Sequence, residues 1–166
     1  MAKTRWLSED EQTTWRAFLT AMRLLTDQLD RELQRDADIP HTYYEILVAL
    51  SEAPGQTMRM NQLADLCQSS RSRLSHAVSR LEETGWVRRV PCPTDKRGAL
   101  AVMTDEGFAA IEAAAPGHVE GVRRHVFDVL TPAQVAQLGE ISAAILEGLL
   151  RTGESGLPGR AGGEKL

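Results

Sequence analysis

The stretch that most constrains the fold lies between residues 61 and 103, where apolar side chains follow first a helical and then a strand-like spacing. A short helix is expected to begin at Asn61, a residue type that caps helices, and the polar residues 68–70 interrupt it. A second helix is expected over residues 71–84, with Gly85 where a glycine commonly ends a helix. Its buried face is predicted to consist of Leu74, Ala77, Val78 and Leu81.

Two short strand-like runs follow at residues 86–90 and 99–103, and turn-forming residues fill the segment 91–98 between them. This pattern predicts a β-hairpin with a long charged tip. A short helix, a tight turn, a second helix and a hairpin is the order of a winged helix-turn-helix. The sequence therefore predicts a mainly α-helical fold with a small β-hairpin wing.

Longer amphipathic helices are expected on both sides of this core. Ser8 and Glu11 have the spacing of a capping box, and apolar residues recur at steps of three and four after them. Pro40 is expected at the first position of the next helix. Further along, Pro116 and Gly117 are expected to kink or break a helix.

The composition excludes several classes of protein. The chain has 166 residues, of which 42% are hydrophobic and 25% charged, so it can bury a core without disulfides. Two cysteines do not make a secreted disulfide scaffold, and no apolar run approaches the roughly 18 residues of a membrane span. The N-terminus does not resemble a signal peptide, so we expect a cytoplasmic protein with no membrane partner.

Charge is distributed unevenly along the chain. Residues 59–97 contain eight basic and four acidic side chains, although the whole chain has a net charge of −4. A basic middle between acidic ends is typical of a segment that binds a polyanion.

The exposed face of the helix at residues 71–84 is predicted to carry arginines and short hydroxyls, unlike a face that is merely solvated. A helix fits the major groove of DNA, where arginine contacts guanine through two hydrogen bonds and serine adapts to donors or acceptors. At the start of this helix, Ser69 and Ser70 are expected to leave backbone amides for a phosphate. The residues expected on the face are Arg71, Ser72, Arg73, Ser75, His76, Ser79 and Arg80.

The hairpin supplies a second basic element. Lys96 and Arg97 at its tip are expected to reach the neighbouring DNA backbone or a narrow minor groove. We assign Arg88 and Lys96 to phosphate contacts, which position a protein without reading base sequence.

These segments resemble the MarR family of winged-helix transcription regulators. Asp95-Lys96-Arg97 is similar to the family's Asp-x-Arg wing signature, and residues 100–107 are similar to the strand and helix start that follow it. The other segments that carry the resemblance are Gln62-Leu63-Ala64-Asp65-Leu66, Ser72-Arg73-Leu74 and Arg80-Leu81-Glu82-Glu83-Thr84-Gly85-Trp86-Val87-Arg88-Arg89.

The resemblance implies a homodimer that binds a pseudo-palindromic operator, usually represses transcription, and is often released by a small phenolic or oxidant signal. It implies that Asp95 holds Arg97 in place and that Arg97 enters the minor groove. Peroxide-sensing members carry a reactive cysteine near the first helix, and this chain has none there. The residues that the resemblance assigns to the major groove are Ser70, Arg71, Arg73, Ser75 and His76.

Apolar stripes on the first and last helices are too extensive for a small winged core to cover, so a second copy is expected to bury them. The expected organisation is an N-terminal dimerisation helix at residues 1–38, a winged DNA-binding core at 39–107, C-terminal dimerisation helices at 108–151 and a disordered tail at 152–166.

An effector pocket is expected where the dimerisation helices meet the winged core. A small phenolic or other aromatic molecule bound there would change the spacing of the two wings. We expect no cofactor, and the spacing of the histidines does not favour a metal site. The residues predicted to line the pocket are Trp15, Leu19, His41, Tyr44 and Glu45.

Other interpretations of the same residues remain open. Cys67 lies on the apolar face of its helix and is expected to be a buried, inert thiol. Cys92 lies between two prolines in the hairpin, where we expect solvent to reach it; oxidation there is open, but an incidental cysteine is favoured. A winged helix can also serve as a protein-interaction module without specific DNA binding. An enzyme would need a catalytic site that the sequence does not reveal, since no nucleophile motif, carboxylate pair or phosphate loop is present.

Overall fold

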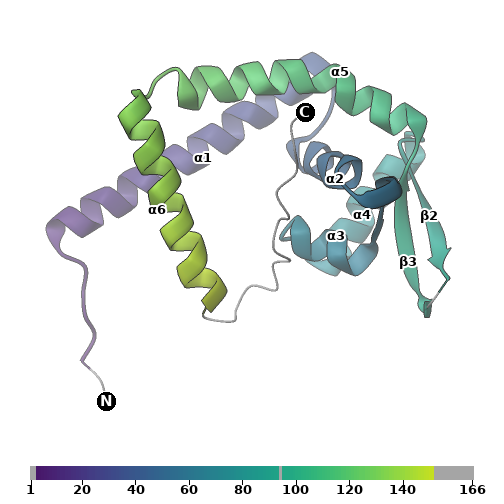
Figure 1. Ribbon diagram of the computed structural model, residues 1–166, viewed down its shortest axis with the longest axis horizontal. Coiled ribbons are helices and arrows are strands. Elements are labelled where there is room, and N and C mark those ends of the chain that lie inside the picture. Colours follow the sequence, from purple (N-terminus) through teal and green to yellow (C-terminus); the bar gives the residue numbers. More distant parts are fainter. Residues whose placement is uncertain (1–2, 94, 152–166) are drawn as a thin grey trace.

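The computed structural model describes residues 3–93 and 95–151, so the predicted tail at 152–166 lies outside the described residues. Its mainly helical architecture with a small sheet confirms the predicted fold class (Figure 1). The elements are α1 (Glu9–Ala37), α2 (His41–Ser51), η1 (Pro54–Gln56), β1 (Thr57–Arg59), α3 (Met60–Leu66), α4 (Arg71–Glu83), β2 (Val87–Cys92), β3 (Asp95–Met103), α5 (Asp105–Val122), η2 (Arg123–Phe127) and α6 (Pro132–Arg151).

The winged core surrounds the apolar helix α2, and α3, α4 and the sheet pack around it (Figure 1). Apolar residues at helical spacing on α2 and α4 form the centre of this core. For α4, the buried residues are those that the spacing predicted. This packing fixes the orientation of α4, so that its opposite face is exposed. The largest fully buried side chains are Ile39, Ile46, Leu47, Leu50, Leu63, Leu74, Val78 and Leu81.

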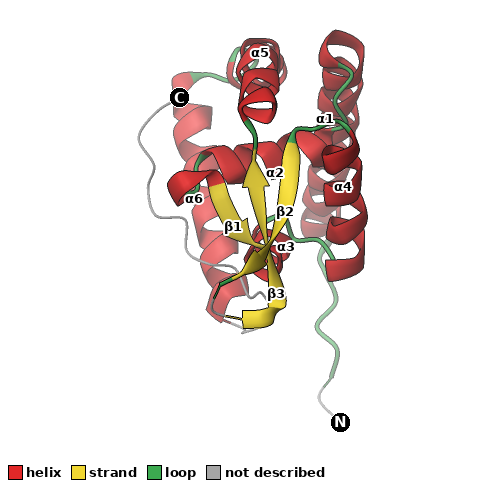
Figure 2. Cartoon of the chain, turned by 90° about the vertical axis from the view of Figure 1, so that its right-hand side faces the viewer, coloured by secondary structure: helices red, strands yellow, loops and turns green. Residues whose placement is uncertain are grey.

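The predicted hairpin is present and forms part of a three-stranded antiparallel sheet in the order β1-β3-β2 (Figure 2). Val87 pairs with Met103 at its base, and a register shift falls between Pro91 and Cys92. The strands continue into the segment predicted to be a turn, because β2 runs to Cys92 and β3 begins at Asp95. Cys92 is only 6% exposed, so the expectation that solvent reaches this thiol was wrong.

Tertiary contacts change three of the predicted helix boundaries. Pro40 is the N-cap of α2 rather than its first residue, and Asp30 of α1 accepts a hydrogen bond of 2.8 Å from the His41 amide. Asn61 is not a cap, since β1 leads directly into α3 and the N-cap is Arg59. Pro116 does not break α5, whose buried face packs on α1 and α2. That burial offsets the cost of a proline inside a helix, about 3 kcal/mol.

Helices α1, α5 and α6 extend away from the winged core (Figure 1). The predicted capping box begins α1, with the Glu11 amide donating to Ser8 Oγ at 3.2 Å and the Ser8 amide donating to Glu11 Oε2 at 2.7 Å. The part of α1 that is buried, around Leu29 and Leu33, is near its C-terminal end. The rest of α1 and all of α6 have no buried residue in the single chain.

None of the helices described is by itself long and apolar enough to cross a membrane, although α5–η2 and α6, bent by 99° to each other, pass that test of length and composition as a pair.

Candidate nucleic-acid interface

The exposed face of α4 carries the arginine, serine and histidine side chains predicted there. Arg71, Ser72, Arg73 and His76 are exposed, while Ser75 and Ser79 are half-buried. The opposite face is held by the core, with Leu74, Ala77, Val78 and Leu81 buried. The buried face was therefore predicted correctly, and so was the exposure of Arg71, Ser72, Arg73 and His76, whereas Ser75 and Ser79 are half-buried beside Arg89 of the wing.

The start of α4 is capped by its own sequence. Ser70 is the N-cap, and its Oγ accepts a hydrogen bond of 3.3 Å from the Arg73 amide. The backbone amide of Arg73 is therefore occupied, which differs from the expectation that Ser69 and Ser70 only leave amides open. Ser69 Oγ donates to the carbonyl of Ser70 at 3.4 Å.

At the other end of α4, Arg80 forms an ion pair with Glu83, and Nη1 lies 2.7 Å from Oε2. The hydrogen bond to Glu83 raises the pKa of Arg80. Both side chains are exposed, so solvent screens this pair and it is expected to contribute little to stability. Arg80 can exchange Glu83 for a phosphate at little cost.

The wing presents one arginine to solvent and turns the next one inward. Arg88 is exposed on β2, as its predicted phosphate contact requires, whereas Arg89 is half-buried against α4. Asp95 is exposed and lies close over Gly98, where an added Cβ would be 2.9 Å from Asp95 Oδ2. The side chains of Lys96 and Arg97 lie outside the described residues, so the predicted pairing of Asp95 with Arg97 stays a prediction.

Hollows flank α4 on both sides. A hollow of about 510 Å³ between α4 and the wing is lined in part by Arg59, Arg71 and Arg89. Another, of about 650 Å³, lies between α4 and the start of α2, and Tyr43, Arg73 and Arg80 contribute to it. On the wing side, Arg59 and Arg89 bring basic side chains from other elements next to α4, whereas on the α2 side the basic side chains are those of α4 itself.

Sequence reasoning assigned no role to Arg59 or Arg89. Arg59 is the last residue of β1, and a strand of three residues is too short to be recognised from its pattern. Arg89 could have been found, because successive residues of a strand point to opposite faces. If Arg88 faces solvent, then Arg89 faces the opposite way, toward α4.

The predicted pocket residues fall into two separate groups. The first group is His41, Tyr44 and Glu45 of α2, next to His118 of α5. The His118 ring lies 4.5 Å from the Tyr44 ring and 5.8 Å from the His41 ring, and His41 Nδ1 lies 3.6 Å from Glu45 Oε1. Burial lowers the pKa of His118, and His41 lowers it further. Burial raises the pKa of Tyr44.

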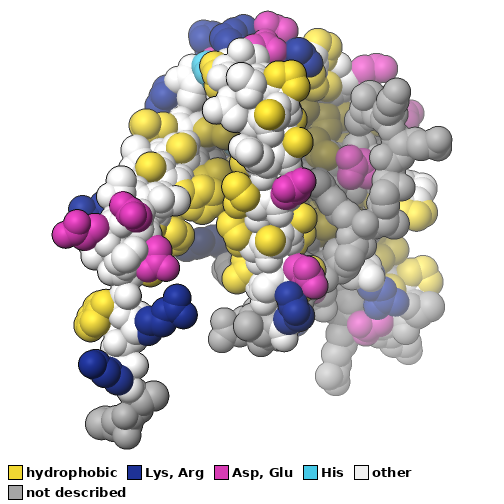
Figure 3. Space-filling model, turned by 60° about the vertical axis from the view of Figure 1, so that its left-hand side comes forward, with side chains coloured by type: hydrophobic (Ala, Val, Ile, Leu, Met, Phe, Trp, Pro, Cys, Tyr) yellow, Lys and Arg dark blue, Asp and Glu magenta, His cyan; other side chains and the backbone are white. Residues whose placement is uncertain are grey.

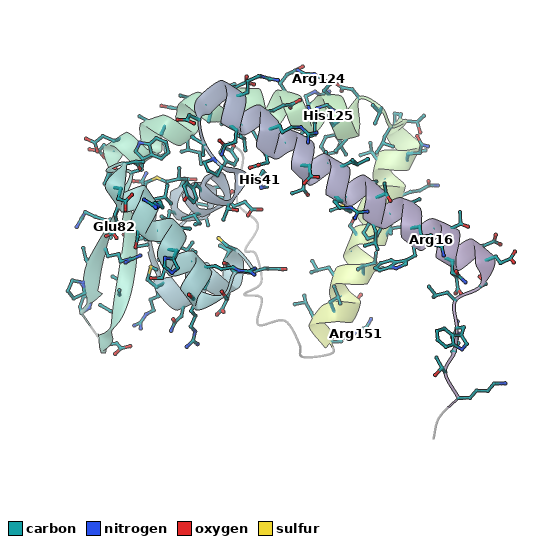
Figure 4. All side chains as sticks on the ribbon, turned by 180° about the vertical axis from the view of Figure 1, so that it is seen from behind. Arg16, His41, Glu82, Arg124, His125 and Arg151 are labelled. Atoms are coloured by element: carbon teal, nitrogen blue, oxygen red, sulfur yellow. The ribbon has the colours of Figure 1, made fainter. Side chains whose placement is uncertain are left out.

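The other two predicted pocket residues lie elsewhere in the chain. Trp15 and Leu19 are exposed on the N-terminal half of α1, at 50% and 42%. Arg16, next to Trp15, is labelled at the far end of α1 in Figure 4, remote from His41. One chain therefore does not bring the five predicted residues together.

Cys67 is half-buried rather than fully buried, and burial and then Glu45 raise the pKa of its thiol to about 11, which agrees with an unreactive thiol. Within residues 3–93 and 95–151, no three His, Cys, Asp or Glu side chains come together as a metal site requires.

A recognition helix held by a buried apolar face, a tight turn before it and a hairpin beside it define the chain as a winged helix-turn-helix protein. The MarR family model matches residues 37–98. The chain is 54% identical to Sco3205, a MarR family transcriptional regulator from Streptomyces coelicolor crystallised in complex with DNA. That match covers 89% of this chain and 92% of the other, with a TM-score of 0.84. This chain belongs to the MarR family and is a transcriptional regulator of that family.

Other relatives agree with this assignment. AbsC, a MarR family transcriptional regulator from Streptomyces coelicolor, is 44% identical over 88% of this chain and 98% of its own, with a TM-score of 0.82. The HTH-type transcriptional regulator PecS from Dickeya dadantii is 38% identical over 72 residues, which are 43% of this chain. That matched segment spans 41% of PecS, less than half its length.

Proposed function

We propose that this protein is a cytoplasmic repressor that binds a pseudo-palindromic operator in double-stranded DNA as a homodimer. The observation that carries the proposal is the exposed Arg71–Arg73–His76 face of α4 beside a basic wing. The likeness to Sco3205, whose crystal structure contains DNA, supports it.

In this proposal α4 enters the major groove, where Arg73 reads a guanine edge and Ser70, Arg71, Ser75 and His76 contribute further contacts. Arg88 and Arg80 contact phosphates and position the protein. Lys96 and Arg97 retain their predicted place at the backbone and the minor groove, with Asp95 orienting Arg97. The DNA-binding unit is then residues 39–107.

The dimer is proposed to form through residues 1–38 and 108–151. Trp15, Phe18 and Met22 are between 43% and 50% exposed on α1. Along α6, Ile141, Ile145 and Leu149 are exposed by 47% to 56%. Figure 3 shows hydrophobic side chains along both helices. A large apolar patch of this kind marks an interaction surface, and a second copy buries it in an isologous contact.

An effector is proposed to bind where α1, α2 and α5 meet, against His41, Tyr44 and Glu45. The nearest hollow beside His118 lies between α1 and α5, borders Glu32 as well, and is about 60 Å³; its lining does not include His41, Tyr44 or Glu45. Ligand pockets are typically about 300 Å³ or more, so this hollow is too small for a phenolic ring. We propose that Trp15 and Leu19 of a second protomer complete an enlarged pocket in the dimer.

The test is selection of bound sequences from random double-stranded DNA with the purified full-length protein, repeated with a series of phenolic ligands. Enrichment of an inverted repeat, with half-sites about 10 base pairs apart, supports the proposal. Failure to enrich any sequence at low salt would instead favour a protein-interaction module. A ligand that reduces binding only when His41, Tyr44 and Trp15 are intact supports the proposed pocket.

A further inference from the structure

Arg89 joins the wing to the recognition helix through several polar contacts. Its Nη2 donates hydrogen bonds to the carbonyl oxygen of Ser75 and, at 3.0 Å, to Ser79 Oγ. Its backbone amide donates to Glu82 Oε1 at 2.8 Å, and its Nε lies 3.5 Å from Glu82 Oε2. One residue of β2 therefore contacts three residues of α4.

The three partners lie on one stripe of α4. Ser75, Ser79 and Glu82 are spaced by four and three residues, so they stand one above the other on successive turns. A guanidinium is planar and rigid, and contacts along such a stripe fix its orientation as well as its distance. The contacts therefore set the angle between β2 and the axis of α4.

The surroundings of Arg89 make these contacts difficult to replace with water. The Nε atom is buried and donates no hydrogen bond, so the nearby carboxylate of Glu82 is what offsets its charge. The Ser79 hydroxyl donates in turn to the Ser75 carbonyl at 3.0 Å, which orders the acceptor. Polar groups connected in this way reinforce one another inside a protein.

The contacts lie close to the base of the wing. From Arg89 to Cys92, the end of β2, the strand extends about 10 Å at roughly 3.3 Å per residue. A small rotation at Arg89 is therefore amplified at the far end of the hairpin. The angle set at Arg89 determines where the wing meets DNA when α4 is in the major groove.

We infer that Arg89 is a positioning residue, which locks the wing to the recognition helix so that both engage DNA with one fixed spacing. The DNA part of this inference rests on the proposed function. The lock itself is a property of the free protein, and it is tested without DNA.

The first readout is hydrogen exchange of the wing amides, residues 87–103, in the free full-length protein. Arg89→Ala is expected to accelerate this exchange by about tenfold or more, since charge-assisted hydrogen bonds are lost. Arg89→Lys, which can still donate to Ser75 and Ser79, is expected to restore part of the protection. Arg88→Ala is the matched control, because it removes the neighbouring, exposed arginine and should leave exchange unchanged.

The second readout is affinity for selected operators that vary either at the centre or at the flanks. In Arg89→Ala, the difference in affinity between operators with different flanks is expected to be mostly lost. The ratio of affinities between operators that differ at the centre should stay within about twofold of the wild-type ratio. Arg88→Ala should weaken all operators equally. If Arg89→Lys restores the difference in affinity between flanks, Arg89 acts by positioning the wing and its loss does not simply unfold the protein. Thermal unfolding of each variant monitors folding directly.

If Arg89→Ala unfolds the protein, Glu82→Gln takes its place, since it removes the charge beside Nε and leaves an oxygen to accept from the Arg89 amide. Unchanged wing exchange in both Arg89→Ala and Glu82→Gln would overturn the inference. So would a loss of affinity that is equal on all operators. If the wild-type protein binds no DNA, the proposed function fails, while the exchange experiment still decides whether Arg89 locks the wing.

Discussion

Oε1 of Glu32 in α1 lies 2.9 Å from Nε2 of His125 in η2. This partly buried pair joins the long first helix to the segment between α5 and α6. The same carboxylate oxygen accepts a hydrogen bond of 2.8 Å from Gln28, and Arg124 Nη1 lies 3.7 Å from it. The hydrogen bonds from His125 and Gln28 lower the pKa of Glu32, although burial opposes the shift. The folded protein therefore favours the ionised carboxylate.

The first prediction concerns stability against pH. A carboxyl whose pKa is lower in the folded than in the unfolded state stabilises the fold above its ordinary pKa, about 4.3, and this contribution disappears as pH falls through the folded value. Glu32→Gln should therefore cost about 1–3 kcal/mol at pH 7 and progressively less below about pH 4. Urea unfolding at a series of pH values measures the difference. Glu112→Gln, an exposed carboxyl on α5, is the control and should change little at any pH.

The second prediction compares two glycines on α5. A Cβ at Gly121 would lie 2.6 Å from Glu32 Oε2 and 3.3 Å from Leu29 Cδ2, whereas a Cβ at Gly117 meets nothing within 4 Å. Glu32 must shift to make room for a methyl group at this position, and that shift disturbs the contact of its other oxygen, Oε1, with His125. Gly121→Ala should therefore destabilise by about 1–3 kcal/mol, and Gly117→Ala should stabilise by up to about 1 kcal/mol through helix propensity.

Urea unfolding at pH 7 distinguishes the two glycine variants. The pH dependence attributed to Glu32 should also shrink in Gly121→Ala. Equal effects of the two substitutions would contradict the close packing of α5 on α1.

The sequence predicted those features that depend on neighbouring residues. The Ser8–Glu11 capping box, the buried face of α4 and the glycine after it, Gly85 at φ +78°, are all local, and all three are present. β1 escaped prediction because three residues carry too little pattern, and the strand exists only by pairing with β3.

The site was predictable to the same extent. The exposed side chains of α4 follow from helical periodicity, and they were identified. The link from Arg89 to Ser75 spans 14 residues, and the link from His125 to Glu32 spans 93. Contacts of this kind depend on how elements pack, which a single sequence does not express. The same reason explains why Trp15 and His41 were assigned to one pocket although one chain separates them.

The third prediction concerns the apolar face of α6. If a second copy covers it, placing a charge there should separate the dimer, because an unpaired charge at an apolar contact is costly. Ile145→Glu should give a light-scattering mass near 18.3 kDa, and the unaltered protein should give twice that mass. The affinity of Ile145→Glu for the operator should also fall, because the proposed binding unit is the dimer.

Ala143→Glu is the matched control for the dimer, since Ala143 is exposed on the other side of α6 and lies two residues away. It should leave the mass at the dimer value. A single-chain mass for the unaltered protein at micromolar concentration would refute the proposed dimer.

The fourth prediction separates the roles of two arginines on α4. Arg73 is exposed one turn into the helix, and its backbone amide rather than its side chain takes the Ser70 cap. Arg73→Ala therefore keeps the cap and should not weaken the fold. If Arg73 contacts a guanine, its loss should cost about 1–3 kcal/mol of binding and relax preference at one symmetric pair of base positions.

Arg80 should behave differently, because it lies near the end of α4 and is paired with the exposed Glu83. Arg80→Ala should weaken binding to all operators alike and reduce the slope of log affinity against log salt by about one, as the loss of one phosphate contact predicts. Titrations of both variants at several fixed salt concentrations, on operators altered one base pair at a time, measure the two effects. If Arg73→Ala weakened every operator equally while Arg80→Ala altered preference at one position, the assignment of these two side chains would be reversed.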